Sequence, residues 1–173
     1  MESPNFDARP SLAGVELIVI HNISLPPGHF STDAVEDLFS NRLDCTSHPY
    51  FAGLRDLRVS AHFLIRRGGA LIQFVSCANR AWHAGVSNWR GRESCNDFSI
   101  GIELEGTDVR AYTARQYARL ADLTRDLIGA FPGIAGVAGH AEIAPARKTD
   151  PGASFDWPRF MRGAHLPVRM RDI

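Results

Sequence analysis

Hydrophobic residues form a nearly continuous run in Val15–Ile20 and a regular alternation in Ser99–Glu105. The first run (VELIVI) is apolar on both faces and rich in β-branched side chains, which predicts a buried central strand that ends at His21-Asn22. In the second (SIGIELE), the three aliphatic side chains face one way, whereas Glu103 and its glycine and glutamate neighbours face the other. Both segments are therefore predicted to be strands, and the second has a polar face.

A longer hydrophobic period predicts a helix over Thr113–Phe131. Its apolar stripe consists of Tyr117, Leu120, Leu123, Leu127 and Ile128. Gln116 follows Thr113 by three positions, which is the pattern of a capping box, and Pro132-Gly133 ends the helix. This helix is therefore bounded by residues that favour its start and its end.

Shorter patterned segments complete the predicted fold. Two β-patterned runs, Ala61–Ile65 and Ala70–Val75, surround Gly68-Gly69 and predict a hairpin. The other predicted elements are a strand near Val137 and short helices over Thr32–Phe39, with Ser31 or Thr32 as cap, and near Phe155–Met161. Strands mixed with a few helices, one of them long, predict an α/β (α+β) fold in which helices pack on a sheet.

Composition and charge narrow the class of protein. The chain has 173 residues, 45% of them hydrophobic, and no repeat or long linker, which predicts a single domain over residues 1–173. Its 19 basic residues balance 19 acidic ones, and this argues against a nucleic-acid partner because nucleic-acid-binding domains are usually strongly basic. No run of about 18 apolar residues is present, so no segment is expected to span a membrane.

The start of the chain and its cysteines predict the compartment. The residues that follow Met1 are polar and acidic, so no secretory signal is expected. Cys45, Cys77 and Cys95 are odd in number and widely spaced, which predicts three free thiols in a reducing cytosol. We therefore expect a cytoplasmic protein, and no obligate protein partner is evident from the sequence.

Three dispersed residues have the chemistry of a metal site. His21 and His140 each follow an apolar strand, where a side chain emerges from a rigid scaffold into a loop-built cleft, and Asp150 comes ten residues after His140. Two imidazoles and a carboxylate are the donors of a catalytic zinc site, which keeps a fourth position for water. Spacing alone does not choose these three, because it also admits His62, His83 or Glu103 as ligands.

Lys148 and Glu103 are the candidate catalytic residues. Lys148 is the only lysine in the chain; the other 18 basic residues are arginines. Either this lysine has no special role, or the site needs a compact ammonium beside a metal ligand to stabilise an oxyanion. Glu103 is either a solvent-facing glutamate or, if its face lines the metal cleft, a general base for a bound water. The chain contains no GxGxxG, P-loop, GxSxG or HExxH motif, which removes dinucleotide-binding, Walker-type NTPase and zincin functions.

Several sequence blocks, in order along almost the whole chain, resemble one enzyme family. They are VIHNISLPPG (19–28), HPYF (48–51), VSAHFLIRR (59–67), RAWHAGVS (80–87), CNDFSIGIELEGTD (95–108) and RKTDPG with FDW (147–157). In these blocks the chain resembles the zinc amidases of bacterial cell-wall recycling, the AmpD-type 1,6-anhydro-N-acetylmuramyl-L-alanine amidases. Any one block alone is weak, but their number and order are specific.

The resemblance implies a fold, a cofactor and the roles of particular residues. The implied fold, shared with phage amidase endolysins and peptidoglycan recognition proteins, is a central mixed sheet flanked by helices. One zinc ion per chain is expected on His21, His140 and Asp150, with Glu103 and Lys148 in the catalytic roles above and Tyr50 assisting. The side chains implied to contact the anhydro-sugar are Asn22, Arg58 and Trp82.

The implied activity is hydrolysis of the amide that joins anhydro-N-acetylmuramic acid to L-alanine of a stem peptide, with an anhydro-muropeptide as substrate. Three alternatives stay open at this stage. The first is a binding module that captures muropeptides without cutting them. The second is an exported or phage-borne amidase that acts on intact peptidoglycan, and the third is a protein whose zinc is only structural.

Overall fold

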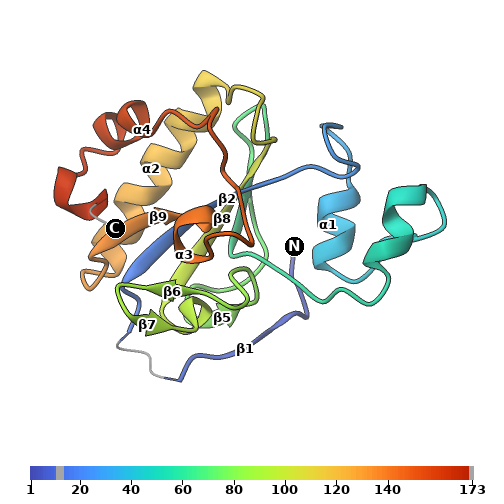
Figure 1. Cartoon of the computed structure of the whole chain (residues 1–173), viewed down its shortest axis with the longest axis horizontal. Coiled ribbons are helices and arrows are strands. Elements are labelled where there is room, and N and C mark those ends of the chain that lie inside the picture. The colour runs from blue at the N-terminus through green and yellow to red at the C-terminus, as the bar shows by residue number, and fades with distance from the viewer. Residues whose placement is uncertain (11–13, 172–173) are drawn as a thin grey trace.

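A five-stranded mixed sheet forms the centre of the computed structural model, which describes residues 1–10 and 14–171 (Figure 1). In spatial order, its strands are β4 (Leu71–Gln73), β3 (Phe63–Ile65), β8 (Ser99–Glu105), β2 (Leu17–Ile23) and β9 (Gly136–Gly139). The β8 strand runs parallel to both β2 and β3, and β2 runs parallel to β9, whereas β4 is antiparallel to β3. This arrangement confirms the predicted mixed sheet and the hairpin around Gly68-Gly69.

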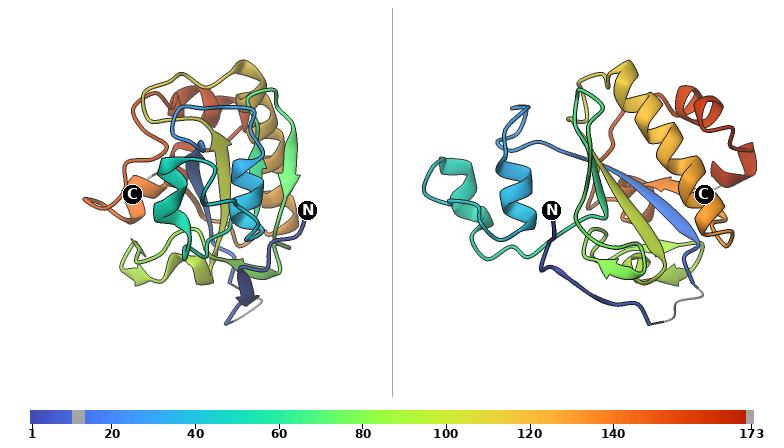
Figure 2. Two further views of the ribbon diagram at one scale, coloured as in Figure 1. Left: turned by 90° about the vertical axis from the view of Figure 1, so that its right-hand side faces the viewer. Right: turned by 180° about the vertical axis from the view of Figure 1, so that it is seen from behind.

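One face of the sheet is covered by helix α2 (Ala114–Ala130), and helix α4 (Trp157–Gly163) packs against α2, as Figures 1 and 2 show. The largest apolar cluster lies between the sheet and these helices. It includes Ile20 and Ile102 from the strands and Leu120 from α2. The α2 helix begins with the predicted capping box: Thr113 Oγ1 accepts a hydrogen bond from the backbone N–H of Gln116, and Gln116 Oε1 accepts one from the N–H of Thr113, each at 3.1 Å. The helix is therefore held by both its cap and its buried stripe.

The opposite face of the sheet carries short elements and loops. The helix α3 (His140–Ile143) directly follows β9, and two small two-stranded sheets pair β1 (Phe6–Ala8) with β5 (Asn79–Ala81) and β6 (Asn88–Trp89) with β7 (Arg92–Glu93). The second apolar cluster on this side includes Leu17, Val19 and Phe98. Because both faces are covered, every residue of β8 is buried.

A separate part of the chain extends to one side of the sheet as an arm (Figures 1 and 2). The arm contains α1 (Ala34–Phe39) and a 3₁₀ helix at Pro49–Leu54. A third apolar cluster joins the arm to the sheet through Val35, Leu38 and Leu64. Two more 3₁₀ helices, at Cys95–Asp97 and Val168–Arg171, complete the described elements.

Several predicted boundaries were wrong. The β2 strand continues through Ile23, so His21 lies within the strand instead of at its end, since pairing with β8 persists to Glu105. Residue Asp33 occupies the N-cap position of α1, with no side-chain hydrogen bond. Neither Ser31 nor Thr32 caps that helix: Ser31 has a φ of 60°, and the Thr32 hydroxyl donates to the carbonyl of Leu25.

Further outcomes concern the end of the chain and the cysteines. The last predicted helix is observed as α4, two residues later than expected, because Asp156 accepts a hydrogen bond from Arg159 N–H and so caps it. Its end merges into a turn before the 3₁₀ helix at Val168–Arg171.

The three cysteines are free thiols, as predicted. None of the helices in the described part of the chain has the length and apolar character that a membrane span requires.

Candidate functional site

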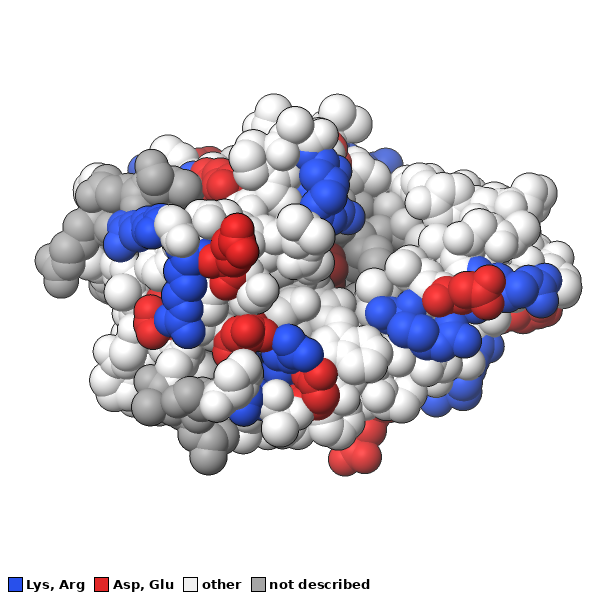
Figure 3. Space-filling view, turned by 60° about the horizontal axis from the view of Figure 1, so that its bottom comes forward, with Lys and Arg blue, Asp and Glu red and all other residues white. Residues whose placement is uncertain are grey.

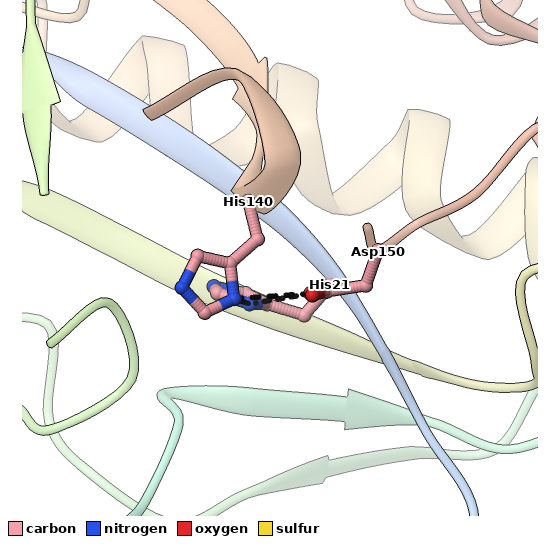
Figure 4. A group of neighbouring side chains, drawn as sticks. All are labelled: His21, His140 and Asp150. Carbon is pink, nitrogen blue, oxygen red and sulfur yellow. Dashed lines mark hydrogen bonds and ion pairs between the residues drawn. The ribbon is translucent and has the colours of Figure 1, made fainter. Parts of the chain in front are cut away.

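Three side chains that are distant in the sequence converge near the carboxyl-terminal parts of β2 and β9. The Nδ1 atoms of His21 and His140 are 2.9 Å apart, and each lies 3.1 Å from Oδ2 of Asp150 (Figure 4). Among the described residues, these three form the one group of histidine, cysteine and carboxylate side chains with ligand atoms close enough to share a metal ion. The structure thus brings together the three residues that the family resemblance implied as ligands.

Strand register explains this convergence. Ile20 of β2 is paired with Gly139 of β9, so the residues that follow them, His21 and His140, are neighbours at the same edge of the sheet. Ligand sites in sheets with parallel strands commonly form at such carboxyl ends. Asp150 returns to this edge because its carbonyl accepts a hydrogen bond of 2.9 Å from the N–H of Ala141 in α3.

The donor atoms fit a zinc ion. Nε2 of His140 lies 3.0 Å from the carbonyl oxygen of Ala84, which can only accept, so the ring proton is on Nε2 and Nδ1 presents a lone pair. In that tautomer the Nδ1 lone pair faces Oδ2 of the Asp150 carboxylate at 3.1 Å, and a cation bound between the two atoms would stabilise them. Burial lowers the pKa of His21 to about 4, which keeps this imidazole neutral, as a metal ligand must be.

Glu103 lies beside the cluster on β8, where it is paired in register with His21 of β2. It is only 8% exposed, which excludes the solvent-facing alternative. Its Oε2 atom is buried and has no hydrogen-bond partner within the described protein. Burial, followed by the negative charge of Asp150, raises the pKa of Glu103 well above its ordinary value. A buried carboxyl group with an unused oxygen and a raised pKa is suited to exchange a proton with a bound reactant.

A cleft of about 810 Å³ contains the cluster and runs between the sheet and the arm; Figure 3 shows this face hollowed between the two parts. All nine residues predicted for the site line this cleft: His21, Asn22, Tyr50, Arg58, Trp82, Glu103, His140, Lys148 and Asp150. Acidic and basic side chains are interspersed on the face seen in Figure 3. The cleft therefore combines a buried base, formed by His21, Glu103 and His140, with a more open rim.

The rim residues differ in how they are held. Asn22, next to His21, donates a hydrogen bond of 2.8 Å from Nδ2 to Asp108 Oδ1. The half-buried Trp82 donates from Nε1 to Asp7 Oδ1 at 3.2 Å. Tyr50 and Arg58 are exposed on the arm, and Tyr50 is 48% accessible. These side chains are positioned along the walls, away from the convergent ligand atoms.

Comparison with known proteins identifies the family. A family model described as N-acetylmuramoyl-L-alanine amidase matches residues 11–153. The chain belongs to this amidase family. It is 58% identical over 159 residues to the 1,6-anhydro-N-acetylmuramyl-L-alanine amidase AmpD of Salmonella typhimurium strain SL1344, an alignment that covers 91% of this chain and 85% of the relative.

Solved structures of related amidases share the fold. The crystal structure of a selenomethionine derivative of AmpD superposes with a TM-score of 0.92 at 57% identity, and the match covers 94% of this chain and 92% of that one. The amidase AmiD from E. coli, solved with anhydro-N-acetylmuramic acid-L-Ala-D-γ-Glu-L-Lys, matches with a TM-score of 0.64 at 30% identity, over 86% of this chain and 57% of AmiD. The chain is accordingly an amidase with the fold that the resemblance implied.

The structure also shows where the other three candidate ligands of this amidase lie relative to the cluster. His62 is fully buried beneath the cluster, where its Nδ1 accepts a hydrogen bond of 3.0 Å from the N–H of Gly101. Nδ1 of His83 lies 2.9 Å from Nε2 of His21, on the side of the His21 ring opposite the convergent atoms. Glu103 is adjacent to the cluster but outside the group of shared ligand atoms. These three residues therefore surround the candidate metal site instead of completing it.

Asp108 of this amidase is a site residue that was not predicted from the sequence. Its two carboxylate oxygens accept hydrogen bonds from Asn22 Nδ2 and from Thr149 Oγ1, at 2.8 and 2.5 Å. It thereby links a predicted sugar-contacting residue to the loop that carries Lys148 and Asp150. The only sequence signal was its place at the end of the CNDFSIGIELEGTD block, because the loop that it contacts is distant in sequence.

Proposed function

We propose that this amidase hydrolyses the amide bond between 1,6-anhydro-N-acetylmuramic acid and L-alanine of the stem peptide, in cytoplasmic recycling of muropeptides. The observation that carries the proposal is the convergence of His21, His140 and Asp150 beside the buried Glu103 in one cleft. The activity in the name of the 58% identical relative supports the choice of bond and sugar.

A single zinc ion is the proposed cofactor, held by Nδ1 of His21, Nδ1 of His140 and a carboxylate oxygen of Asp150. Two imidazoles and one carboxylate leave a coordination position open, which is the pattern of catalytic zinc sites. When bound, zinc supplies a Lewis acid that polarises the scissile carbonyl and lowers the pKa of a water towards about 7. The protein contributes the orientation of the ligands and a cleft from which bulk water is partly excluded.

Glu103 is the proposed general base and acid. It takes a proton from the attacking water as the new carbon–oxygen bond forms, and it gives that proton to the nitrogen of L-alanine as the carbon–nitrogen bond breaks. The products are a muramic carboxylic acid and a free peptide amine, so the residue returns to its starting state. Its burial and its unused Oε2 support this role, because the proton acceptor is not occupied by another protein donor.

Lys148 is proposed to donate a hydrogen bond to the oxyanion that develops on the carbonyl oxygen. It lines the cleft two residues before Asp150, and its ammonium is a compact charge. Preorganised donors of this kind typically contribute about 10²–10³ in turnover. Tyr50 lines the arm side of the same cleft, and we propose that it assists by closing on the bound substrate.

The proposed sugar contacts are Asn22, Arg58 and Trp82. Trp82 offers an aromatic surface to a sugar ring, Asn22 offers amide hydrogen bonds, and Arg58 offers a cation on the arm. The related amidase AmiD was solved with an anhydro-muramyl peptide as its substrate, and this supports the same ligand class for the present cleft.

The proposed function is tested by mass spectrometry of the products from a purified anhydro-muropeptide, with intact sacculi as the comparison substrate. Release of free stem peptide from the anhydro form alone is the expected result. Asp150→Ala is the control, since it removes a proposed ligand and should abolish cleavage and stoichiometric zinc binding together.

Other outcomes point to the alternatives. Release of peptide from sacculi at a comparable rate would instead support an amidase that acts on intact peptidoglycan. Tight binding of the anhydro-muropeptide by the zinc-loaded wild-type protein with no cleavage would support a binding module. Either result overturns the proposal as stated.

A further inference from the structure

A chain of hydrogen bonds lies behind His21, on the side of its ring that faces away from the candidate metal. The Ser99 hydroxyl lies 2.5 Å from the carbonyl oxygen of Cys95 and 3.2 Å from Nε2 of His83. A carbonyl oxygen can only accept, so the single hydroxyl proton of Ser99 is donated to Cys95. Towards His83, Ser99 can then only accept, and Nε2 of His83 must carry the ring proton.

The proton position on His83 in turn determines the proton position on the candidate ligand His21. A neutral imidazole has one ring proton, so Nδ1 of His83 presents a lone pair. That atom lies 2.9 Å from Nε2 of His21, which must therefore donate to it. With its proton on Nε2, His21 presents a lone pair at Nδ1, the atom that faces His140 and Asp150.

The position of the His83 ring is determined by its surroundings. The backbone N–H groups of His83 and Ala84 both donate to Asn96 Oδ1, at 3.1 and 2.8 Å. The ring lies against β8 at Gly101, where a Cβ would overlap the imidazole carbons. The rings of His21 and His83 meet edge to face, with centroids 5.0 Å apart. The glycine of the SIGIELE strand is thus the residue that makes room for His83.

Ala84, the residue after His83, contacts the second candidate histidine ligand, His140. The carbonyl oxygen of Ala84 accepts a hydrogen bond from Nε2 of His140 at 3.0 Å, and Arg147 Nη2 donates to the same oxygen at 2.6 Å. The His83-Ala84 dipeptide therefore contacts Nε2 of both candidate imidazole ligands. The His83 side chain contacts His21, and the Ala84 carbonyl contacts His140.

We propose that the His83-Ala84 dipeptide is a positioning element that holds the ring proton of both His21 and His140 on Nε2, so that two Nδ1 lone pairs and the Asp150 carboxylate face one another ready for zinc. His83 is a positioning residue and not a ligand in this scheme. The inference rests on the zinc site of the proposed function. Outer partners of this kind typically contribute about 10–100-fold to metal affinity.

The direct test is the ring-proton position in the zinc-free protein, measured by long-range ¹H–¹⁵N correlation NMR on uniformly ¹⁵N-labelled wild type. Signals of His21 and His83 are assigned from the spectra of His21→Asn and His83→Asn. Both rings are expected as Nε2–H tautomers. Detection of His21 with its proton on Nδ1 would overturn the proposal, and the tautomer is observed in the wild-type protein itself.

The second test is zinc affinity, measured by competition with a chelator of known affinity. His83→Phe keeps a ring but has no acceptor, so affinity should fall about 10–100-fold. His83→Asn places a carbonyl oxygen near the former Nδ1 and should restore affinity to within a few-fold of wild type. His29→Phe, which changes an exposed histidine, is the matched control and should bind zinc as wild type does.

The outcomes separate this inference from the proposed function. If His83→Phe binds zinc as tightly as wild type, the positioning role is wrong even where the amidase cleaves its substrate. If the zinc affinities and tautomers are as expected but the anhydro-muropeptide is not cleaved, only the proposed function fails. Should His83→Phe not fold, Gly101→Ala displaces the same ring from the β8 side and is expected to show the same loss of affinity.

Discussion

His21 and Glu103 are direct partners in the parallel pairing of β2 with β8, and both side chains emerge on the face of the sheet opposite α2. Paired residues of parallel strands point to the same side, so the candidate ligand and the candidate base are neighbours through backbone geometry alone. Neither side chain needs a flexible loop to reach the other. His21 and Glu103 are therefore held by two adjacent inner strands of the central sheet.

Glu103→Gln is expected to lower the rate of amide cleavage by about 10²–10⁴ while stoichiometric zinc binding is retained, because the amide cannot accept the proton of water. The measurement is steady-state hydrolysis of the anhydro-muropeptide with metal analysis of the same sample. Glu93→Gln, at an exposed position in β7, is the matched control and should keep wild-type turnover. Unchanged turnover in Glu103→Gln would reject the role of Glu103.

The same substitution should increase the stability of the zinc-free protein at neutral pH. Burial raises the pKa of Glu103 above its ordinary value of 4.5, so the folded state binds this proton more tightly than the unfolded state. The free energy of unfolding therefore falls as pH rises from that ordinary value through the raised pKa. Glutamine lacks this titration, so the stability of Glu103→Gln relative to wild type should increase as pH rises.

Urea unfolding of metal-free wild type and Glu103→Gln at pH 5 and pH 8 measures this effect. The difference in unfolding free energy between the two proteins should be larger at the higher pH. An equal difference at both pH values would show that the carboxyl group of Glu103 titrates in the folded protein as it does in the unfolded chain.

Lys148→Met should lower kcat by about 10²–10³ with a much smaller change in KM, since an oxyanion exists only after attack on the carbonyl. Lys148→Arg should recover only part of the rate, because a planar guanidinium does not replace a compact ammonium. Arg115→Met, at an exposed position in α2, controls for loss of one positive charge. A rise in KM at constant kcat would instead assign Lys148 to substrate binding.

Asp108→Ala should raise KM several-fold and leave kcat nearly unchanged, because Asn22 loses the acceptor that orients its amide. An unpartnered polar group of this kind typically costs about 1–3 kcal/mol. Kinetics of Asp108→Ala, Asn22→Ala and the double variant form the measurement. The two effects should be less than additive if they act through one interaction, and full additivity would separate them.

Chelation of zinc should abolish activity and leave the fold in place. Three apolar clusters hold the sheet, the helices and the arm together without any contribution from the ligand residues. Far-ultraviolet circular dichroism should be unchanged after chelation, and added zinc should restore turnover. Loss of the helical signal on chelation would indicate a structural metal, as in domains whose folding is coupled to metal binding.

Local patterns in the sequence determined a good part of this fold. The capping box at Thr113 and the stripe on Thr113–Phe131 predicted α2, since both depend on residues within a few positions of one another. The alternation in Ser99–Glu105 predicted the full extent of β8. The short helix at His140–Ile143 and the pairing of Phe6–Ala8 with Asn79–Ala81 were missed, because very short elements depend on tertiary partners more than on pattern.

The candidate site shows the same division. The sequence by itself identified two histidines near apolar strands, although only His140 directly follows its strand, together with an aspartate and a single lysine. The resemblance selected His21, His140 and Asp150 among several admissible ligands. Only the tertiary structure decided that β9, β2 and β8 are adjacent and in which register, which brings two imidazoles together and buries Glu103 beside them. Strand order and register are set by non-local packing and pairing, and spacing along the chain carries no direct record of them.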